Sequence, residues 1–157
     1  NMKAQNLVQC VLISCLSMIM LAPIARGDDA ADIAKASRAA EKFINDYVAM
    51  TFPDQRAVIA WVNKRQDVFP IFKERLSKLY LDALKADPEC GYGADAILST
   101  VENAGTKYRT VDTCYRREHI RVTLKAIAPA GNDHKVDVVM MEDGGRWLVQ
   151  SCGDIPM

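Results

Sequence analysis

Apolar and polar residues alternate along the last third of the chain and predict a set of antiparallel strands. Between residues 120 and 126 every second residue is apolar, a period of two that is typical of a strand with one buried and one solvent-facing side. Turn-forming residues at 128–133 interrupt this pattern before a nearly continuous apolar strand at 136–141. A second turn at 143–145 precedes a strand at 146–152, so the pattern predicts two successive hairpins.

The first half of the chain shows the three- and four-residue spacing of amphipathic helices. Apolar positions recur in this way along 28–50, around 58–62, and most regularly over 69–84, where charged residues occupy the opposite side. An alternating stretch at 108–115 predicts the first strand. The pattern at 94–101 fits either a helical turn or a strand, and both interpretations stay open.

Helices followed by a meander of strands define the α+β class. We therefore expect amino-terminal helices packed on a curved antiparallel sheet. The length and the apolar content suffice for one hydrophobic core, so the sequence predicts a single domain over residues 28–157.

The first 27 residues have the pattern of a cleaved signal peptide. Lys3 gives a short positive start, an apolar run follows at 7–21, and small residues flank Arg26 in the segment 25–27. The sequence therefore predicts cleavage before Asp28 and a periplasmic or secreted location for the mature chain. A lipoprotein that carries its lipid on Cys15 is the alternative.

The net charge of the mature chain and the length of the apolar run in the leader limit the kinds of partner that we expect. Removal of residues 1–27 leaves 18 basic and 20 acidic residues, a net charge of about −2, whereas nucleic-acid binding requires a basic surface. A retained membrane anchor is a further alternative, but the apolar run is shorter than the roughly 20 residues of a membrane span. We therefore favour cleavage and expect no stable membrane insertion after it. With His119 and His134 as the two histidines and no closely spaced cysteine pair, the sequence predicts no metal site and no cofactor.

Three cysteines remain after the leader, and an oxidising compartment favours disulfides. A turn at 104–106 is expected to fold the segment that starts at Ala96 back beside Cys114, which would bring Cys90 close to it. We therefore predict a Cys90–Cys114 disulfide, which closes a loop of about 24 residues and contributes roughly 3 kcal/mol if it acts through chain entropy. Cys152 is then a buried thiol, with an intermolecular bridge as the alternative.

The final strand, Gly145-Arg146-Trp147-Leu148-Val149, follows a turn and completes an order of helices and strands that resembles the nuclear-transport-factor-2-like superfamily. The resemblance covers the layout of residues 30–152. It implies a cone-shaped fold in which a curved sheet wraps a helix and leaves a pocket at the wide end, and a tendency to dimerise through the open sheet face. The superfamily includes isomerases, dehydratases and exported proteins that only bind. No catalytic residue of the superfamily can be aligned to this chain.

Two polar turns are the predicted partner-binding sites, because side chains at hairpin ends are free to pair. They comprise Asn132, Asp133 and His134 in the first turn and Glu142 and Asp143 in the second.

Four aromatic residues are candidates for lining a pocket, with core packing as the alternative: Trp61, Tyr80, Tyr108 and Trp147. His119 stands among arginines, a pattern typical of an anion site or of a solvated strand edge, and we favour the strand edge. Asp95 and Asp112 would form an acid pair only if the fold brought them together, and capping of turns is the simpler role.

No nucleophile and base stand at a recognisable spacing, and the chain has no phosphate loop, dinucleotide fingerprint or nucleophile elbow. We therefore expect an exported, non-catalytic binding protein, and in particular an inhibitor or immunity-type protein that sterically blocks a toxin or cell-wall hydrolase. The alternatives are a small-ligand-binding protein of the cone fold and an isomerase or lyase that uses the same pocket. A homodimer is a further option.

Overall fold

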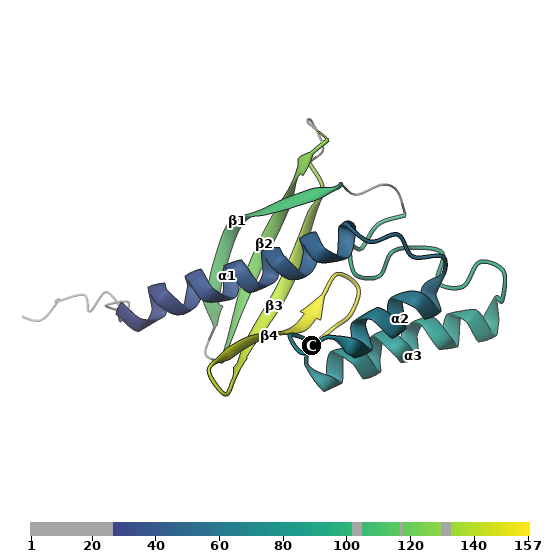
Figure 1. Cartoon of the computed structure of the whole chain (residues 1–157), viewed down its shortest axis with the longest axis horizontal. Helices are drawn as coiled ribbons and strands as arrows, with labels where there is room; N and C mark the ends of the chain where they lie inside the picture. The colour runs from purple at the N-terminus through teal and green to yellow at the C-terminus, as the bar shows by residue number, and fades with distance from the viewer. Residues whose placement is uncertain (1–26, 102–104, 117, 130–132) are drawn as a thin grey trace, which may run out of the picture.

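The computed structural model describes residues 27–101, 105–116, 118–129 and 133–157, which form three helices followed by a four-stranded sheet (Figure 1). This arrangement confirms the predicted α+β class. The predicted signal peptide, residues 1–27, lies outside the described residues except for Gly27. None of the described helices has the length and apolar character to cross a membrane. In chain order the elements are α1 (Gly27–Val48), α2 (Gln55–Lys64), α3 (Pro70–Ala86), β1 (Lys107–Arg116), β2 (His119–Ala128), β3 (Lys135–Asp143) and β4 (Arg146–Cys152).

The four strands form one antiparallel sheet in the order β1-β2-β3-β4, so each strand pairs with its neighbour in sequence. Ile120 of β2 pairs with Tyr115 of β1 and with Met140 of β3, which sets the register across the sheet. At the β4 edge, Val68 forms a parallel bridge to Val149 and ties the start of α3 to the sheet. β1 forms the opposite edge.

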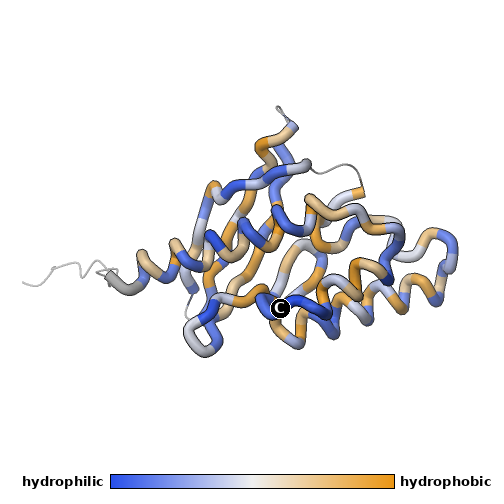
Figure 2. The backbone as a smooth tube through the Cα atoms, viewed as in Figure 1, coloured by the Kyte–Doolittle hydropathy of each residue, from blue (hydrophilic) through white to orange (hydrophobic). Residues whose placement is uncertain are grey.

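α1 lies across one face of the sheet and contacts all four strands, whereas α2 and α3 pack on each other beside β4 (Figure 1). Figure 2 shows hydrophobic positions concentrated in the strands that α1 crosses, with hydrophilic positions along the outer sides of the helices. The periodic stripe predicted for the first helix is the side that packs on the sheet, and its buried members are Ala36, Ala40, Phe43, Ile44 and Tyr47.

Local signals explain where the other helices begin and what the ambiguous segment becomes. The Asp54 carboxylate accepts a backbone N–H from the first turn of α2 at 2.8 Å and caps that helix. Pro70 occupies the first turn of α3, where a missing N–H breaks no helical hydrogen bond. The segment 94–101 forms a turn that an Asp95–Thr100 bridge closes, so it is neither of the two predicted alternatives.

Two buried tyrosines hold this turn against the helices. The Tyr47 hydroxyl on α1 donates to the Asp95 carboxylate at 2.8 Å, and the Tyr80 hydroxyl on α3 accepts the N–H of Ala96 at 3.1 Å. Burial raises the pKa of both phenols, so both hydroxyls stay protonated at neutral pH.

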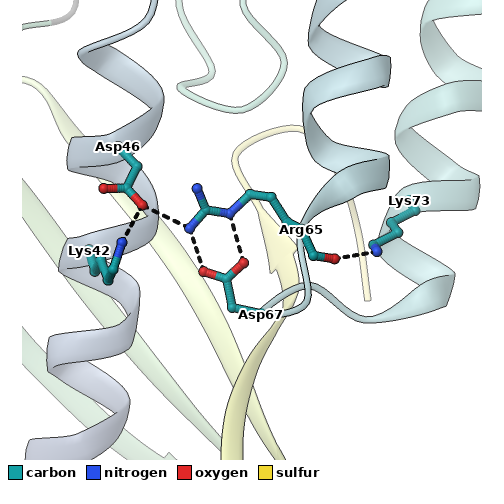
Figure 3. A network of polar contacts seen from close by, with 5 residues as sticks. All are labelled: Lys42, Asp46, Arg65, Asp67 and Lys73. Atoms are coloured by element: carbon teal, nitrogen blue, oxygen red, sulfur yellow. Dashed lines mark hydrogen bonds and ion pairs between the residues drawn. The ribbon is translucent and has the colours of Figure 1, made fainter.

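Arg65 joins the three helices through one polar network (Figure 3). Its guanidinium donates to Asp67 at 2.7 Å and to Asp46 of α1 at 2.9 Å, and its central carbon lies 4.5 Å from the ring centroid of Trp61. Its backbone carbonyl accepts a hydrogen bond from Lys73 of α3 at 2.5 Å. Only 14% of the Arg65 side chain is exposed, so its charge depends on these partners.

The same network shifts the titration of its members. Burial alone would raise the pKa of Asp46, but the hydrogen bonds from Lys42 and Arg65 outweigh burial, and the pKa lies below its ordinary value. A carboxyl with a lowered pKa stabilises the fold above its unfolded-state pKa, and this contribution is lost as the pH falls through the folded-state value. The network therefore weakens in acid.

The predicted Cys90–Cys114 disulfide is wrong, because both residues and Cys152 are free thiols. Cys90 lies in the exposed loop after α3, and Cys114 lies in β1 on the other side of the molecule (Figure 1). The segment that was expected to return beside Cys114 packs against the end of β4 instead, where the Ala96 carbonyl accepts the N–H of Asp154 at 2.8 Å. This contact separates the two cysteines.

Close approach of two backbones at this contact requires glycine at position 153. Gly153 has a φ of +55°, and a Cβ added there would lie 2.4 Å from the carbonyl oxygens of Ala96 and Ile97. Gly144 in the β3–β4 turn has a similar φ of +58°, but no atom lies within 4 Å of its added Cβ. A substitution at Gly144 therefore tests backbone strain alone, whereas a substitution at Gly153 tests backbone strain together with a steric clash.

We predict that Arg65→Met lowers the free energy of unfolding by about 2–3 kcal/mol, because it leaves Asp67 without its cation and Asp46 with Lys42 alone. Lys42→Met is the matched control: it removes the other partner of Asp46, but 68% of the Lys42 side chain is exposed, so its loss should stay near 0.5 kcal/mol. Urea denaturation followed by circular dichroism measures both values. Equal losses would show that Arg65 has no special role.

We predict that Gly144→Ala costs about 1 kcal/mol through its left-handed backbone alone. Gly153→Ala should lower the free energy of unfolding by about 2 kcal/mol more than Gly144→Ala. Its methyl group would clash with two backbone oxygens, which cannot move aside as the end of a flexible side chain can. Thermal and urea unfolding compare the two variants. If Gly153→Ala is no less stable than Gly144→Ala, the contact between the β4 end and residues 96–97 is looser than described.

We predict that iodoacetamide modifies Cys90 in the native protein and spares Cys152. Cys90 is exposed, whereas Cys152 is fully buried with its Sγ 3.2 Å from the Ile97 carbonyl oxygen, and burial raises the pKa of its thiol. After unfolding without a reductant, mass spectrometry of the peptides should find Cys90, Cys114 and Cys152 all alkylated. A disulfide-linked peptide pair containing Cys90 and Cys114 would contradict the free-thiol arrangement.

Candidate functional site

One end of the sheet carries a hollow of about 430 Å³, at the end where β1 turns into β2 and β3 turns into β4. The first turns of α1 form one wall, and the two strand turns form the others. We call it the hairpin-end hollow, and its lining residues are Asp32, Lys35, Tyr115, Glu118, Met141, Glu142, Gly145 and Trp147.

Strand topology brings these residues together. In an antiparallel meander alternate turns lie at the same end of the sheet, so the turn after Arg116 lies beside the turn after Asp143. The register also places Glu142 directly opposite Trp147. α1 begins at this end of the sheet (Figure 1), which adds its first charged residues to the same hollow.

Three carboxylates frame the hollow and one ammonium group offsets part of their charge. Among the lining residues that the structure describes, Asp32, Glu118 and Glu142 are acidic and Lys35 is basic, which gives these residues a net charge of −2. The Lys35 ammonium nitrogen lies 3.3 Å from an Asp32 oxygen. That pair is well exposed, so it is weak and can exchange partners. A basic side chain is therefore the complementary ligand.

Aromatic and apolar side chains complete the lining. Trp147 is 9% exposed, so its ring is mostly covered and presents a limited apolar surface to the hollow. Tyr115 is 45% exposed at the rim, and Met141 is half-buried. Aromatic rings beside carboxylates suit a Lys or Arg side chain, because its apolar stem packs on the ring while its charge pairs with the acids.

Glu142 is held in place by the turn that follows it. Its carboxylate accepts the backbone N–H of Gly145. Gly144 and Gly145 have φ values of +58° and +81°, two consecutive left-handed residues that are typical of a type I′ hairpin turn. The backbone therefore positions this carboxylate at the tip of the hairpin.

The two predicted partner-binding turns lie at opposite ends of the sheet. The turn that contains residues 132–134 joins β2 to β3, whereas Glu142 and Asp143 adjoin the β3–β4 turn. Glu142 lines the hairpin-end hollow, and Asp143 is exposed and pairs with Arg146 across the hairpin. One contact surface at an end of the sheet can therefore include only one of the two turns.

The first of these turns is engaged within the chain. Asn132 lies outside the described residues. Asp133 forms an ion pair with Lys125 at 2.5 Å, and this pair lowers the pKa of the Asp133 carboxyl. Nδ1 of His134 lies 2.9 Å from the Tyr108 hydroxyl, and burial raises the pKa of Tyr108 to about 12. Asp133 and His134 thus help to join β2, β3 and β1.

The four aromatic pocket candidates have different environments. Trp147 lines the hairpin-end hollow, and Tyr80 lines a second hollow of about 300 Å³ beside the end of α1. Trp61 packs on Phe43 with 5.8 Å between ring centroids. Tyr108 is 1% exposed and belongs to the core. Tyr80 is also 1% exposed and belongs to the core. Core packing is therefore the observed environment of Trp61, Tyr80 and Tyr108.

The remaining sequence candidates belong to other parts of the molecule. The Asp95 carboxylate accepts the N–H groups of the next turn residues and the Tyr47 hydroxyl, whereas Asp112 is exposed in β1 opposite Thr123, so the structure does not pair the two acids. His119 pairs with Met141 across the sheet. Among the described residues, no group of three or more His, Cys, Asp or Glu is placed to hold a metal ion.

Comparisons with protein-family models, with curated proteins and with solved structures give no match for this chain. The resemblance to the nuclear-transport-factor-2-like superfamily therefore stays a prediction.

Among the charged and aromatic lining residues, sequence reasoning did not identify four: Asp32, Lys35, Tyr115 and Glu118. The sequence pattern places the first two on the polar side of a helix and the other two near a strand end, which are ordinary positions for such residues. Their role becomes visible only when α1 crosses the sheet and its start meets the strand turns.

Proposed function

We propose that this chain is an exported, non-catalytic binding protein that blocks a secreted toxin or cell-wall hydrolase, and that the hairpin-end hollow is its contact site. The observation that carries the proposal is the combination of three carboxylates with the aromatic residues Tyr115 and Trp147 in one hollow at the end of two hairpins. This combination suits a Lys or Arg side chain of a protein partner.

The shape of this end supports a steric mechanism. The β3–β4 turn is exposed at Asp143, Gly144 and Gly145, so the hairpin tip is free to enter a cleft. A partner side chain that inserts into the hollow would bury Tyr115, which is 45% exposed, and the small part of Trp147 that is still exposed. Residues that dominate the binding energy of protein interfaces are enriched in Tyr and Trp at central, water-excluded positions. The carboxylates would speed association with a basic cleft rim.

A small ligand in the same hollow is the second candidate. Its volume of about 430 Å³ lies in the range of roughly 300–1,000 Å³ that ligand pockets occupy. The same charge argument applies, so such a ligand would be cationic. Isothermal titration with free lysine, arginine and spermidine tests this candidate separately from a protein partner.

We predict that the chain captures a protein from the periplasmic and secreted fraction of its source, and that Glu118→Gln with Glu142→Gln lowers this capture at least tenfold. The double substitution removes two of the three acidic groups of the hollow and keeps their size. The matched control is Glu74→Gln with Glu89→Gln, two exposed acids away from the hollow, which should leave capture unchanged. Quantitative mass spectrometry of the bound fraction measures each variant.

A captured hydrolase should also lose activity when the unsubstituted chain is added, and should keep it when the Glu118→Gln, Glu142→Gln chain is added. Capture that is equal for all three proteins would contradict the proposed contact site. Binding of a cationic metabolite without capture of any protein would replace the proposed function by the second candidate.

A further inference from the structure

β1 is the free edge of the sheet, and α1 covers only its first half. The N–H and C=O of Tyr108 bond to the side-chain amide of Asn45, at 2.8 and 3.0 Å, and the N–H of Thr110 donates to the Glu41 carboxylate at 2.6 Å. Asn45 and Glu41 both belong to α1. These backbone groups therefore point away from β2, and helix side chains occupy the place of a further strand.

Beyond the irregularity between Thr110 and Asp112, the backbone groups of every second β1 residue again point away from β2. Tyr108 and Thr110 pair with alternate residues of β2. Val122 and Ile120 continue this alternate series, and they pair with Thr113 and Tyr115, respectively. Their N–H and C=O groups must then also point away from β2. In the part of the chain that the structure describes, no group bonds to these outward atoms.

This open half of the edge leads into the hairpin-end hollow. Tyr115 belongs to both features, since it carries outward backbone groups and its side chain lines the hollow. Glu118 follows just beyond the end of β1 and lines the same hollow. A strand added at residues 112–116 would therefore place its side chains beside the acidic rim.

We propose that the partner docks by adding an extended segment to β1 at residues 112–116, and that a Lys or Arg of this segment enters the hairpin-end hollow. This inference rests on the proposed function and names the form of the partner. Backbone hydrogen bonds to Thr113 and Tyr115 would supply affinity, and the acidic hollow would select the basic side chain.

A second copy of this chain is the competing occupant of the edge. Side chains directly opposite each other in antiparallel strands lie on the same face, so a second β1 would present Thr113 or Tyr115 to the hollow. Neither residue is basic, and the net charge of −2 would stay unpaired. Charge complementarity therefore favours a basic segment of another protein.

The first test uses nuclear magnetic resonance of the unsubstituted chain with a blocked Thr-Lys-Thr-Lys-Thr-Lys peptide. We expect the amides of Thr113 and Tyr115 to exchange at least tenfold more slowly at saturating peptide, whereas a Thr-Glu-Thr-Glu-Thr-Glu peptide should leave them unchanged. No protection by the lysine peptide, or equal protection by both peptides, would overturn the inference. Protection that grows with protein concentration in the absence of peptide would assign the edge to a second copy.

The second test uses Thr113→Pro. This substitution removes an N–H that points away from β2 and breaks no hydrogen bond of the sheet, and an edge strand tolerates proline at such a position. Thr113→Val keeps the N–H and is the matched control. Thr113→Pro should lower capture of the partner at least tenfold, and Thr113→Val should retain it. If Thr113→Pro does not fold, as judged by circular dichroism, the amide-exchange test decides.

The two tests separate the two proposals. If Glu118→Gln with Glu142→Gln abolishes capture while Thr113→Pro retains it, the hollow is the contact site and the added strand is wrong. If neither variant changes capture, both proposals are wrong.

Discussion

Burial of the apolar side of α1 on the inner face of the sheet fixes the positions of the other elements. α1 contacts all four strands, and its buried stripe together with the inner residues of β2 and β3 makes the main core. The polar side of the same helix contacts the β1 edge and the hairpin-end hollow. Asn45 and Glu41 cover half of the β1 edge, and Asp32 and Lys35 form one wall of the hairpin-end hollow. The position of one helix thus sets which edge and which end of the sheet stay accessible.

α2 and α3 lie beside the sheet, and the rings of Trp61 and Phe72 pack on the Phe43 ring of α1. Arg65 adds a contact of defined orientation between these helices and α1. Its guanidinium has fixed donor geometry and donates to Asp46 of α1 and to Asp67 in the α2–α3 connection. The aromatic ring of Trp61 covers it. Such a mostly buried cation costs free energy unless all its partners are in place, and the network therefore favours one arrangement of the three helices.

Periodicity predicted most of the secondary structure, because it records which residues of a helix or strand meet the core. The three helices and four strands all appear close to their predicted ranges. Register was less predictable. Cys152 lies opposite Val138, one residue away from the partner that the Asp143–Arg146 pairing alone would give, because an irregularity between Val139 and Met140 shifts the pairing. Small local displacements of this kind leave no periodic signal.

The class of fold, the order of the elements and the position of Glu142 beside a tight Gly-Gly turn follow from the amino-acid sequence, since each depends on residues close together along the chain. In contrast, the packing of distant segments keeps Cys90 and Cys114 apart and places the two polar turns at opposite ends of the sheet. The same packing brings the start of α1 to the strand turns, where they form an acidic hollow. Contacts between distant segments follow from how the layers pack, and the pattern of any one segment contains no record of them.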